Sequence, residues 1–447
     1  MTKTYDLILR GGTVVSPGGE AVTDIGVVGE TIAAIGDLSK ADAGEVYDAT
    51  GLHVLPGVID SQVHFREPGL EHKEDLETGA RSAALGGVCT VFEMPNTNPS
   101  TITPDLLIDK LDRAKDRMDT DHAFFAGATN ENAQLLTEME QMPGCCGVKV
   151  FMGASTGDLL VKDDAGVERV LRAIKRRAAF HSEDEFRLEE RRDLAVQGDW
   201  TSHPVVRDVE AAVSSTRRLL KLARKAGKRI HVLHISTAEE MELLRDAKDV
   251  ASVEVLPNHL TLAAPEAYER LGAYAQQNPP IREQRHQDAL WRALNAGIVD
   301  VIGSDHAPHT KEEKDRPYPA SPSGTPGVQT MVPVMLTHVA NGKLSLQRFV
   351  ELTSYGQQRV FGIANKGRIA EGYDADFTVV DLKRRETITN EWSKSKSGWT
   401  PYEGFEATGW PVATIVRGGF VMRDGEITRK GGGKPVRFVE TLGPIGA

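Results

Sequence analysis

The chain has little of what marks secreted, membrane or nucleic-acid-binding proteins. Its 447 residues include three cysteines, two of them adjacent, which are too few for a disulfide framework. It has neither a signal peptide nor an apolar run of about 18 residues, so we expect no membrane partner. Its formal charge of -11 makes nucleic acid an unexpected partner as well. These features predict a soluble, cytoplasmic protein.

Both ends of the chain have a β-rich pattern. Residues 4–53 alternate short apolar runs with glycine turns and contain no helix-length periodic segment. The same pattern returns at residues 375–381 and 414–419, and a hairpin signal follows at Asp424-Gly425. We predict that residues 1–53 and 363–447 together form one small, composite β-sandwich domain.

The long middle, residues 54–362, repeats an apolar run followed by a helix-length amphipathic segment, which is typical of βα units around a parallel sheet. The runs cover residues 54–65, 88–94, 123–127, 148–151, 178–181, 230–235, 253–256 and 299–303. Eight is the number of strands in a (β/α)8 TIM-like barrel. An open doubly wound sheet is the alternative, but no Gly-x-Gly-x-x-Gly fingerprint follows the first run. The best-marked helix lies between Asp208 and Gly227.

Polar residues with ligand chemistry stand at the ends of seven of these runs. Taken alone, each is better explained as a packed core histidine or a helix cap. In a barrel enzyme, however, the site is assembled at the carboxyl ends of the strands, so the whole set predicts a metal-dependent hydrolase. Histidine and aspartate around an open position suit zinc, which lowers the pKa of bound water to about 7. The residues are His64, Arg66, Asn96, Lys149, His181, His234, Asn258, His259, Asp305, His306 and His309.

Lys149 does not fit a simple ligand set, because an ammonium group repels a metal cation. A buried lysine can become neutral, and a neutral amine can take up CO2 to form a carbamate that bridges two metals. The alternative, a lysine paired with a carboxylate at the barrel mouth, is the simpler interpretation from chemistry alone.

Three motifs together carry a family resemblance: His64-Phe65-Arg66, Met94-Pro95-Asn96-Thr97 and Asp305-His306-Ala307-Pro308-His309. With them the chain resembles the cyclic amidohydrolases of the amidohydrolase superfamily, and most closely the dihydroorotases. The resemblance spans nearly the whole chain, including residues 147–152, 181–184, 278–282 and 372–376.

The resemblance implies interconversion of (S)-dihydroorotate and N-carbamoyl-L-aspartate in de novo pyrimidine biosynthesis. It implies one or two zinc ions per chain and a homodimer or homotetramer. His64 would bind one metal, His181 and His234 the other, and carboxylated Lys149 would bridge them. Asp305 would be a ligand and the proton shuttle. The substrate carboxylate would be held by Arg66, Asn96 and His309, with Asn278 near the pyrimidine ring.

The chain departs from the family at Gln62, where a further metal-binding histidine is usual. An amide oxygen is a weaker ligand than imidazole, so three outcomes stay open: a weakened binuclear site, a single-metal enzyme, or a catalytically weakened subunit with a structural role. A hydantoinase or allantoinase-type cyclic ureide hydrolase is the nearest enzyme alternative, although a carboxylate clamp at Arg66 has no use on a neutral ring. Asp163 and Asp164 offer a rival bridging ligand, which we interpret as a solvated turn.

Overall fold

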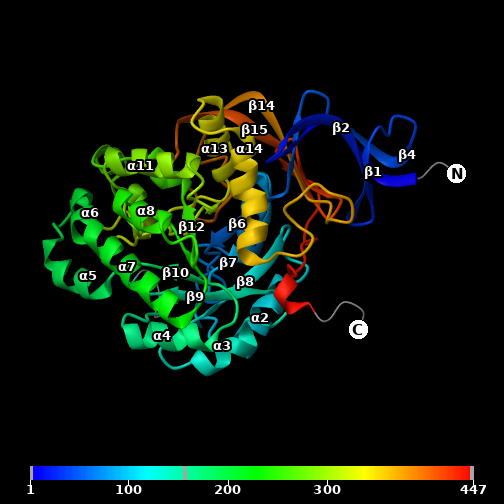
Figure 1. The fold of residues 1–447 in the computed structure, drawn as a ribbon. Helices are drawn as coiled ribbons and strands as arrows, with labels where there is room; N and C mark the ends of the chain where they lie inside the picture. The colour runs from blue at the N-terminus through cyan, green and yellow to red at the C-terminus, as the bar shows by residue number, and fades with distance from the viewer. Residues whose placement is uncertain (1–3, 155–158, 443–447) are drawn as a thin grey trace.

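The computed structural model describes residues 4–154 and 159–442 (Figure 1). Eight parallel strands neighbour one another in chain order, and all their residues are buried. They are β6 (Val58–Val63), β7 (Val88–Glu93), β8 (Asp121–Gly127), β9 (Cys145–Phe151), β10 (Ala178–His181), β11 (Ile230–Val232), β12 (Ala251–Val255) and β13 (Val301–Ile302). A bridge between Val63 and His306 nearly closes the ring. The predicted barrel and its eight strands are confirmed.

Helices follow the barrel strands and cover the outside of the sheet (Figure 1). Those in the first half are α1 (Leu76–Leu85), α2 (Pro104–Ala114), α3 (Ala133–Met139), α4 (Asp164–Ala173), α5 (Glu185–Arg191), α6 (His203–Val206), α7 (Val209–Ala226) and α8 (Ala238–Arg245). Those in the second half are α9 (Pro257–Thr261), α10 (Glu266–Leu271), α11 (Gln284–Asn295), α12 (Lys311–Lys314), α13 (Met331–Ala340), α14 (Leu346–Val350) and α15 (Gly356–Phe361). Within the described ranges, no helix is both long enough and apolar enough to cross a bilayer.

Helix α7 shows how local sequence fixes an element. The Asp208 side chain accepts a hydrogen bond from the Ala211 amide at 3.0 Å and caps the first turn. Gly227 ends the helix at φ 64°, a left-handed conformation that glycine adopts without strain. The predicted bounds of this helix are confirmed.

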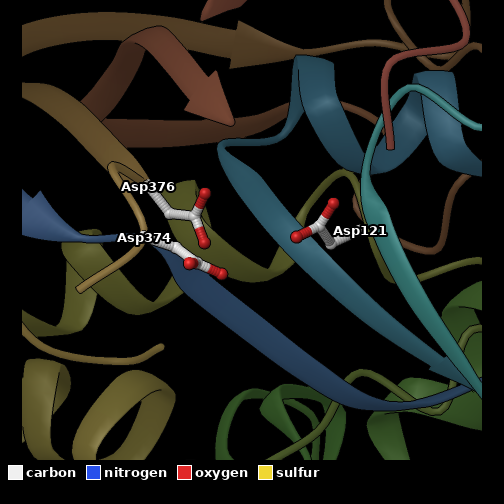
Figure 2. Close-up of side chains that lie close together, drawn as sticks. All are labelled: Asp121, Asp374 and Asp376. Atoms are coloured by element: carbon white, nitrogen blue, oxygen red, sulfur yellow. The ribbon is translucent and has the colours of Figure 1, made fainter. Parts of the chain in front are cut away.

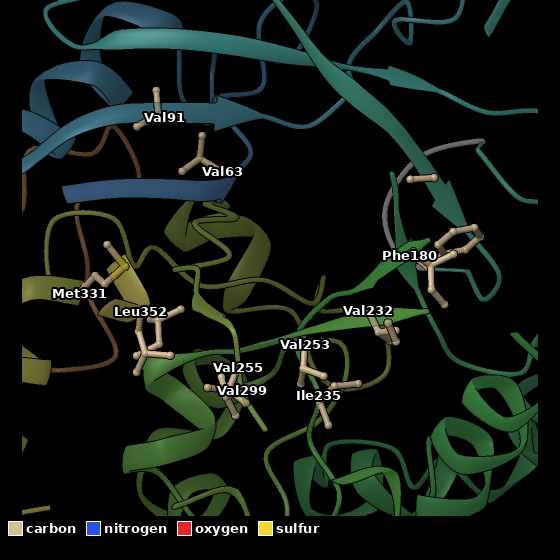
Figure 3. Packing of buried hydrophobic residues seen from close by; sticks show 14 of the residues in the cluster. Val63, Val91, Phe180, Val232, Ile235, Val253, Val255, Val299, Met331 and Leu352 are labelled. Atoms are coloured by element: carbon tan, nitrogen blue, oxygen red, sulfur yellow. The ribbon is translucent and has the colours of Figure 1, made fainter. Parts of the chain in front are cut away.

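Alternate residues of the barrel strands enter two different cores. Val91 packs in the large cluster between strands and helices, which Figure 3 shows, whereas its neighbour Phe92 belongs to a second cluster. That second cluster takes residues from six different barrel strands, so it fills the barrel interior. Cys145 and Cys146 divide between the two clusters in the same way, so their side chains lie on opposite faces of β9.

Strands from both ends of the chain form a separate nine-stranded sheet. It contains β1 (Thr4–Ser16), β2 (Gly19–Val28), β3 (Thr31–Gly36), β4 (Asp42–Asp48), β5 (His53–Pro56), β14 (Phe377–Ile388), β15 (Phe405–Val416), β16 (Gly419–Arg423) and β17 (Glu426–Ile427). Because β5 pairs with β14, the two ends of the chain meet directly. The predicted β unit built from both termini is confirmed, and its domain boundaries stay a prediction.

A buried ionic cluster joins the barrel to this sheet. Figure 2 shows the carboxylates of Asp121, Asp374 and Asp376, whose oxygens lie within 4.8 Å of one another. Asp121 begins β8, whereas the other two precede β14. The Lys366 ammonium pairs with all three carboxylates, and the Arg417 guanidinium lies 2.9 Å from Asp121. Since these two cations already supply the positive charge, the cluster is a structural link rather than a metal site.

Replacing Lys366 with methionine should destabilise the protein by about 3–5 kcal/mol, because three buried carboxylates would lose their shared cation. Urea unfolding followed by circular dichroism measures the change. Lys434→Met is the matched control: its ammonium pairs with Glu30 at the exposed edge of the cluster, so its loss should cost less than about 1 kcal/mol. Equal unfolding midpoints for the two variants would contradict this role of Lys366.

Candidate functional site

The candidate site lies at the carboxyl end of the barrel. His64 and Arg66 follow β6, Asn96 follows β7, His181 ends β10, and the loop after β13 carries Asp305. All of these residues except Asp305, which is intermediate, are buried. The structure therefore places residues from four strands, far apart in sequence, at one end of the barrel.

The first group of possible metal ligands surrounds His64. Its Nδ1 lies 2.8 Å from the Asn96 Oδ1, and its Nε2 lies 3.1 Å from the Asp305 Oδ1. Because the Asn96 oxygen accepts the proton of Nδ1, Nε2 is left with a lone pair that faces a carboxylate. The Gln62 amide donates to the same Asp305 oxygen at 3.0 Å, and its own Oε1 is buried without a partner among the described residues. A lone pair directed at a carboxylate oxygen is an arrangement that a cation completes.

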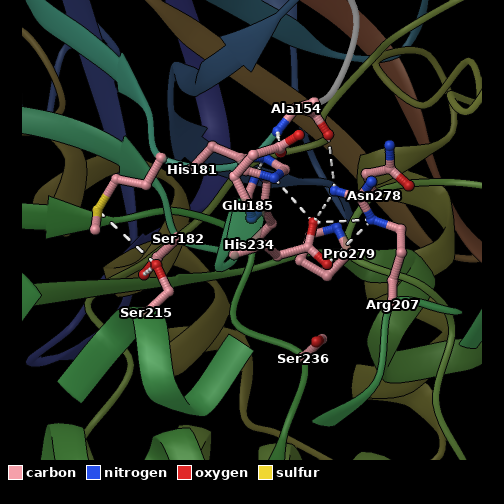
Figure 4. A network of polar contacts seen from close by, with 12 residues as sticks. Ala154, His181, Ser182, Glu185, Arg207, Ser215, His234, Ser236, Asn278 and Pro279 are labelled. Carbon is pink, nitrogen blue, oxygen red and sulfur yellow. Dashed lines mark hydrogen bonds and ion pairs between the residues drawn. The ribbon is translucent and has the colours of Figure 1, made fainter. Parts of the chain in front are cut away.

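His181 and His234 form the second group (Figure 4). The His181 Nδ1 lies 3.1 Å from the His234 Nε2, and the His181 Nε2 lies 2.9 Å from a Glu183 carboxylate oxygen. Glu183 is held in turn by the Arg207 guanidinium, whose Nε lies 3.2 Å away. With its Nε2 proton donated to Glu183, His181 directs the lone pair of Nδ1 toward His234. Burial lowers the pKa of both imidazoles, which keeps them in the neutral form that binds metal.

Lys149 lies among these groups. Its strand neighbours Val148 and Val150 pack in the outer core, so alternation turns Lys149 into the barrel. Burial lowers its pKa to about 7, against the opposing effect of Asp305 and Glu254. No carboxylate in the described part of the chain lies within 4.0 Å of its ammonium nitrogen, so the ion-paired alternative has no described partner.

Three site residues have strained backbones. Arg66, His234 and Asp305 have φ values of 67°, 39° and 47°, in the left-handed region that side chains other than glycine rarely adopt. A strained backbone conformation persists where the surrounding structure holds it in place, and such conformations cluster at functional sites.

Next to the metal groups, Arg66 faces a cavity of about 720 Å³ that Asn96, His309 and Lys73 also line. Arg66 donates from Nε to the Pro308 carbonyl at 3.1 Å, and its Nη2 lies 3.3 Å from the His309 Nε2. It is 2% exposed and forms no ion pair with a carboxylate of the described residues. Burial lowers the pKa of His309 to about 3, so this ring is neutral at pH 7. The cavity thus presents a guanidinium that has no ion pair among the described residues, although Asp305 and Glu93 stabilise its charge from farther away, and such a group suits an anion.

Asn278 lies in the polar network around Arg207 (Figure 4), where its Oδ1 is 3.1 Å from the His203 Nε2. Asp163 caps α4, because its side chain accepts a hydrogen bond from the Gly166 amide at 2.8 Å, and it is exposed. The predicted solvated turn is confirmed, and Asp163 is not a bridging ligand.

Sequence reasoning assigned no role to Glu183 or Lys73. Glu183 had one available signal: a carboxylate two residues after a histidine that ends a buried strand.

The amidohydrolase family model matches residues 53–421. The chain belongs to the amidohydrolase family. It is 36% identical to a dihydroorotase of Methanosarcina mazei over 89% of each chain, and 35% identical to one of Bacillus subtilis over 94% of this chain and 99% of that one. An allantoinase of Deinococcus radiodurans is 33% identical, over 97% and 99%. Among solved structures, the L-hydantoinase of Arthrobacter aurescens superposes with a TM-score of 0.93 at 30% identity, over 97% of this chain and all of that one.

Glu183→Gln should weaken zinc binding roughly 10- to 100-fold, since the amide no longer fixes the His181 ring with its Nδ1 lone pair toward His234. Competition with a chelator of known affinity measures the change. Glu189→Gln is the control, because that carboxylate is exposed on α5 and, among the described residues, forms its one ion pair with Lys162. If both folded variants bind zinc equally, Glu183 does not orient the ligand.

Proposed function

We propose that this protein interconverts (S)-dihydroorotate and N-carbamoyl-L-aspartate, a step of de novo pyrimidine biosynthesis. The buried Arg66 guanidinium without a described carboxylate partner carries the proposal, because dihydroorotate brings a carboxylate beside its cyclic amide. A guanidinium fork matches a carboxylate in two parallel hydrogen bonds. The dihydroorotase relatives at 35–36% identity support the same function.

The side chains at the barrel end have roles that follow from their contacts. His181 and His234 would hold one zinc ion, and His64 with Asp305 would hold a second. A zinc ion bound there supplies an activated water and polarises the ring carbonyl. Asp305 takes the proton from the attacking water and passes it to the leaving amide nitrogen, as base and then acid. Arg66, Asn96 and His309 hold the substrate carboxylate, and Asn278 lies near the ring.

Lys149 is proposed to carry a carbamate that bridges the two metals. Its burial among His64, His181 and His234, and the lack of an ion pair with any described carboxylate, favour a neutral amine that reacts with CO2. Protein equilibrated with 13C-bicarbonate should show a carbamate carbon signal that Lys149→Gln lacks. A wild-type protein without that signal would contradict the carbamate.

Two alternatives use the same site differently. The allantoinase and hydantoinase relatives fit a hydrolase of neutral cyclic ureides, but such a ring leaves the charge of Arg66 unmatched. A weakened subunit with a structural role is the second alternative. Retention of His64, Lys149, His181, His234 and Asp305 favours an active enzyme.

Arg66→Gln should lower kcat/KM for dihydroorotate roughly 30- to 5,000-fold, because truncating one partner of a buried charge pair costs about 2–5 kcal/mol. The assay follows ring opening and closing with purified protein. Arg285→Gln, an exposed arginine paired with Glu239, should be unchanged. A ureide hydrolase would be identified by activity on hydantoin or allantoin that exceeds the activity on dihydroorotate and persists in Arg66→Gln. If the metal-loaded wild type turned over none of these substrates, the structural subunit would be favoured.

Gln62→His should raise the zinc content toward two ions per chain, since an imidazole would replace an amide beside Asp305. Elemental analysis of purified, zinc-equilibrated protein measures the stoichiometry. Gln62→Leu, which has no ligand atom, is the control and should hold no more zinc than wild type. Two ions per chain in all three proteins would show that position 62 does not limit metal binding.

We also propose a homodimer or homotetramer that works in the cytoplasm. Size-exclusion chromatography with light scattering tests the oligomeric state, and a monomer at micromolar concentration would contradict it.

A further inference from the structure

A second cavity, of about 310 Å³, lies at the opposite end of the barrel from the candidate site. Six of its lining residues directly precede strands β10 and β11, whereas His181 ends β10 and His234 follows β11. Six of the residues that line it are cationic: Lys175, Arg176, Arg177, Lys228, Arg229 and Arg359. Such a concentration is unexpected in a chain with a formal charge of -11.

Strand register holds two of these cations together. Ala178 pairs with Ile230, so the preceding Arg177 and Arg229 stand side by side at the ends of neighbouring strands. Burial, and then the charge of Arg229, lowers the pKa of Arg177 to about 10. The Arg177 guanidinium therefore remains charged at pH 7, and that of Arg229 repels it.

The cations outnumber their carboxylate partners. Arg176 pairs with Glu440 at 3.3 Å, and Arg359 pairs with Glu351. Among the described residues, no carboxylate forms an ion pair with Lys175, Arg177, Lys228 or Arg229. Arg177 and Lys228 donate to backbone carbonyls instead, those of Ile230 and Ile174. Among the described residues, these four cations therefore have no ion pair, and the carboxylates of Asp300 and Glu440 act on Arg177 from beyond ion-pairing distance.

The cavity combines three exposed cations, Lys175, Arg229 and Arg359, with buried residues. Arg176 is 4% exposed, its Nη1 donates to the carbonyls of Glu140 and Cys145 at 2.8 Å, and its guanidinium carbon lies 4.6 Å from the centre of the Phe438 ring. The buried residues Cys146, Val360 and Phe361 also line the cavity. Small-molecule sites combine apolar walls with a few fixed polar groups, and this cavity has both features. A lysine-rich surface has neither.

We propose that this cavity binds a phosphate group, from inorganic phosphate or from a small phosphorylated molecule. Guanidinium groups match phosphate oxygens with paired, charge-assisted hydrogen bonds, and a doubly charged anion offsets more of the repulsion than a carboxylate does. The volume is at the lower end of the roughly 300–1,000 Å³ of small-molecule sites.

Isothermal titration calorimetry with inorganic phosphate, pyrophosphate and adenosine monophosphate tests the proposal on the full-length, zinc-loaded protein. Wild type should bind one anion per chain, and Arg177→Gln/Arg229→Gln should bind it at least tenfold more weakly. Arg224→Gln is the matched control, because this arginine of α7 is outside the cavity and pairs with Asp249. Tighter binding of pyrophosphate or the nucleotide than of phosphate would identify a phosphorylated ligand, and equal binding would identify phosphate itself.

Two further measurements separate this site from the carboxylate clamp and from a folding defect. Binding should persist in Arg66→Gln, and its loss there would place the anion in the clamp and overturn the proposal. The ligand-free double variant should melt no lower than wild type, because it removes a like-charge contact. If the double variant melts at a lower temperature, the single variant Arg229→Gln replaces it, because Arg229 is exposed. That single variant must still weaken anion binding. The proposal would also be overturned if wild type showed no saturable binding at anion concentrations up to about 10 mM, which covers weak, millimolar affinities.

Discussion

The closing contact of the barrel brings the first and last strands together, and the candidate site depends on it. The His64 amide donates to the His306 carbonyl at 2.7 Å, and the Ser304 amide donates to the buried Asp60 carboxylate at 2.9 Å. These bonds set the register that places His64 beside Asp305, 241 residues later in the chain. A slip of one residue would turn His64 to the other face of its strand. The geometry of the first metal group is therefore a consequence of how the barrel closes.

Burial makes the two halves of the site complementary. Asn96 and Glu183 satisfy one nitrogen each of His64 and His181. The free lone pair of His64 Nε2 then faces the Asp305 carboxylate, a repulsive contact that a cation between them would reverse. The Arg66 guanidinium has the opposite need, because it is buried without a described anion. A low-dielectric surrounding makes both deficits costly, and a substrate that combines a carboxylate with a ring carbonyl next to a bound metal meets both at once.

Much of this architecture could be predicted because fully buried strands appear as apolar runs, and their polar ends mark one edge of the barrel. Gly57 shows what the sequence hides. Residues 54–65 look like one strand, yet β5 pairs in the nine-stranded sheet and β6 in the barrel. A Cβ at Gly57 would lie 2.7 Å from the Asp376 side chain, a close approach set by a segment more than 300 residues away. Glu183 was missed for a similar reason, since its contacts with His181 and Arg207 depend on how three segments converge.

The charge of the chain limits how the clamp can act. With a formal charge of -11, the protein repels an anionic substrate at long range. At physiological salt, screening with a Debye length of about 8 Å confines this repulsion to the region close to the protein surface. Inside the cavity, the proposed contacts of Arg66 with the substrate would act at hydrogen-bonding distance, where screening by mobile ions is weak. The proposed clamp would therefore position the carboxylate beside the metal ligands more than capture it from solution, and its effect on kcat/KM would depend little on ionic strength.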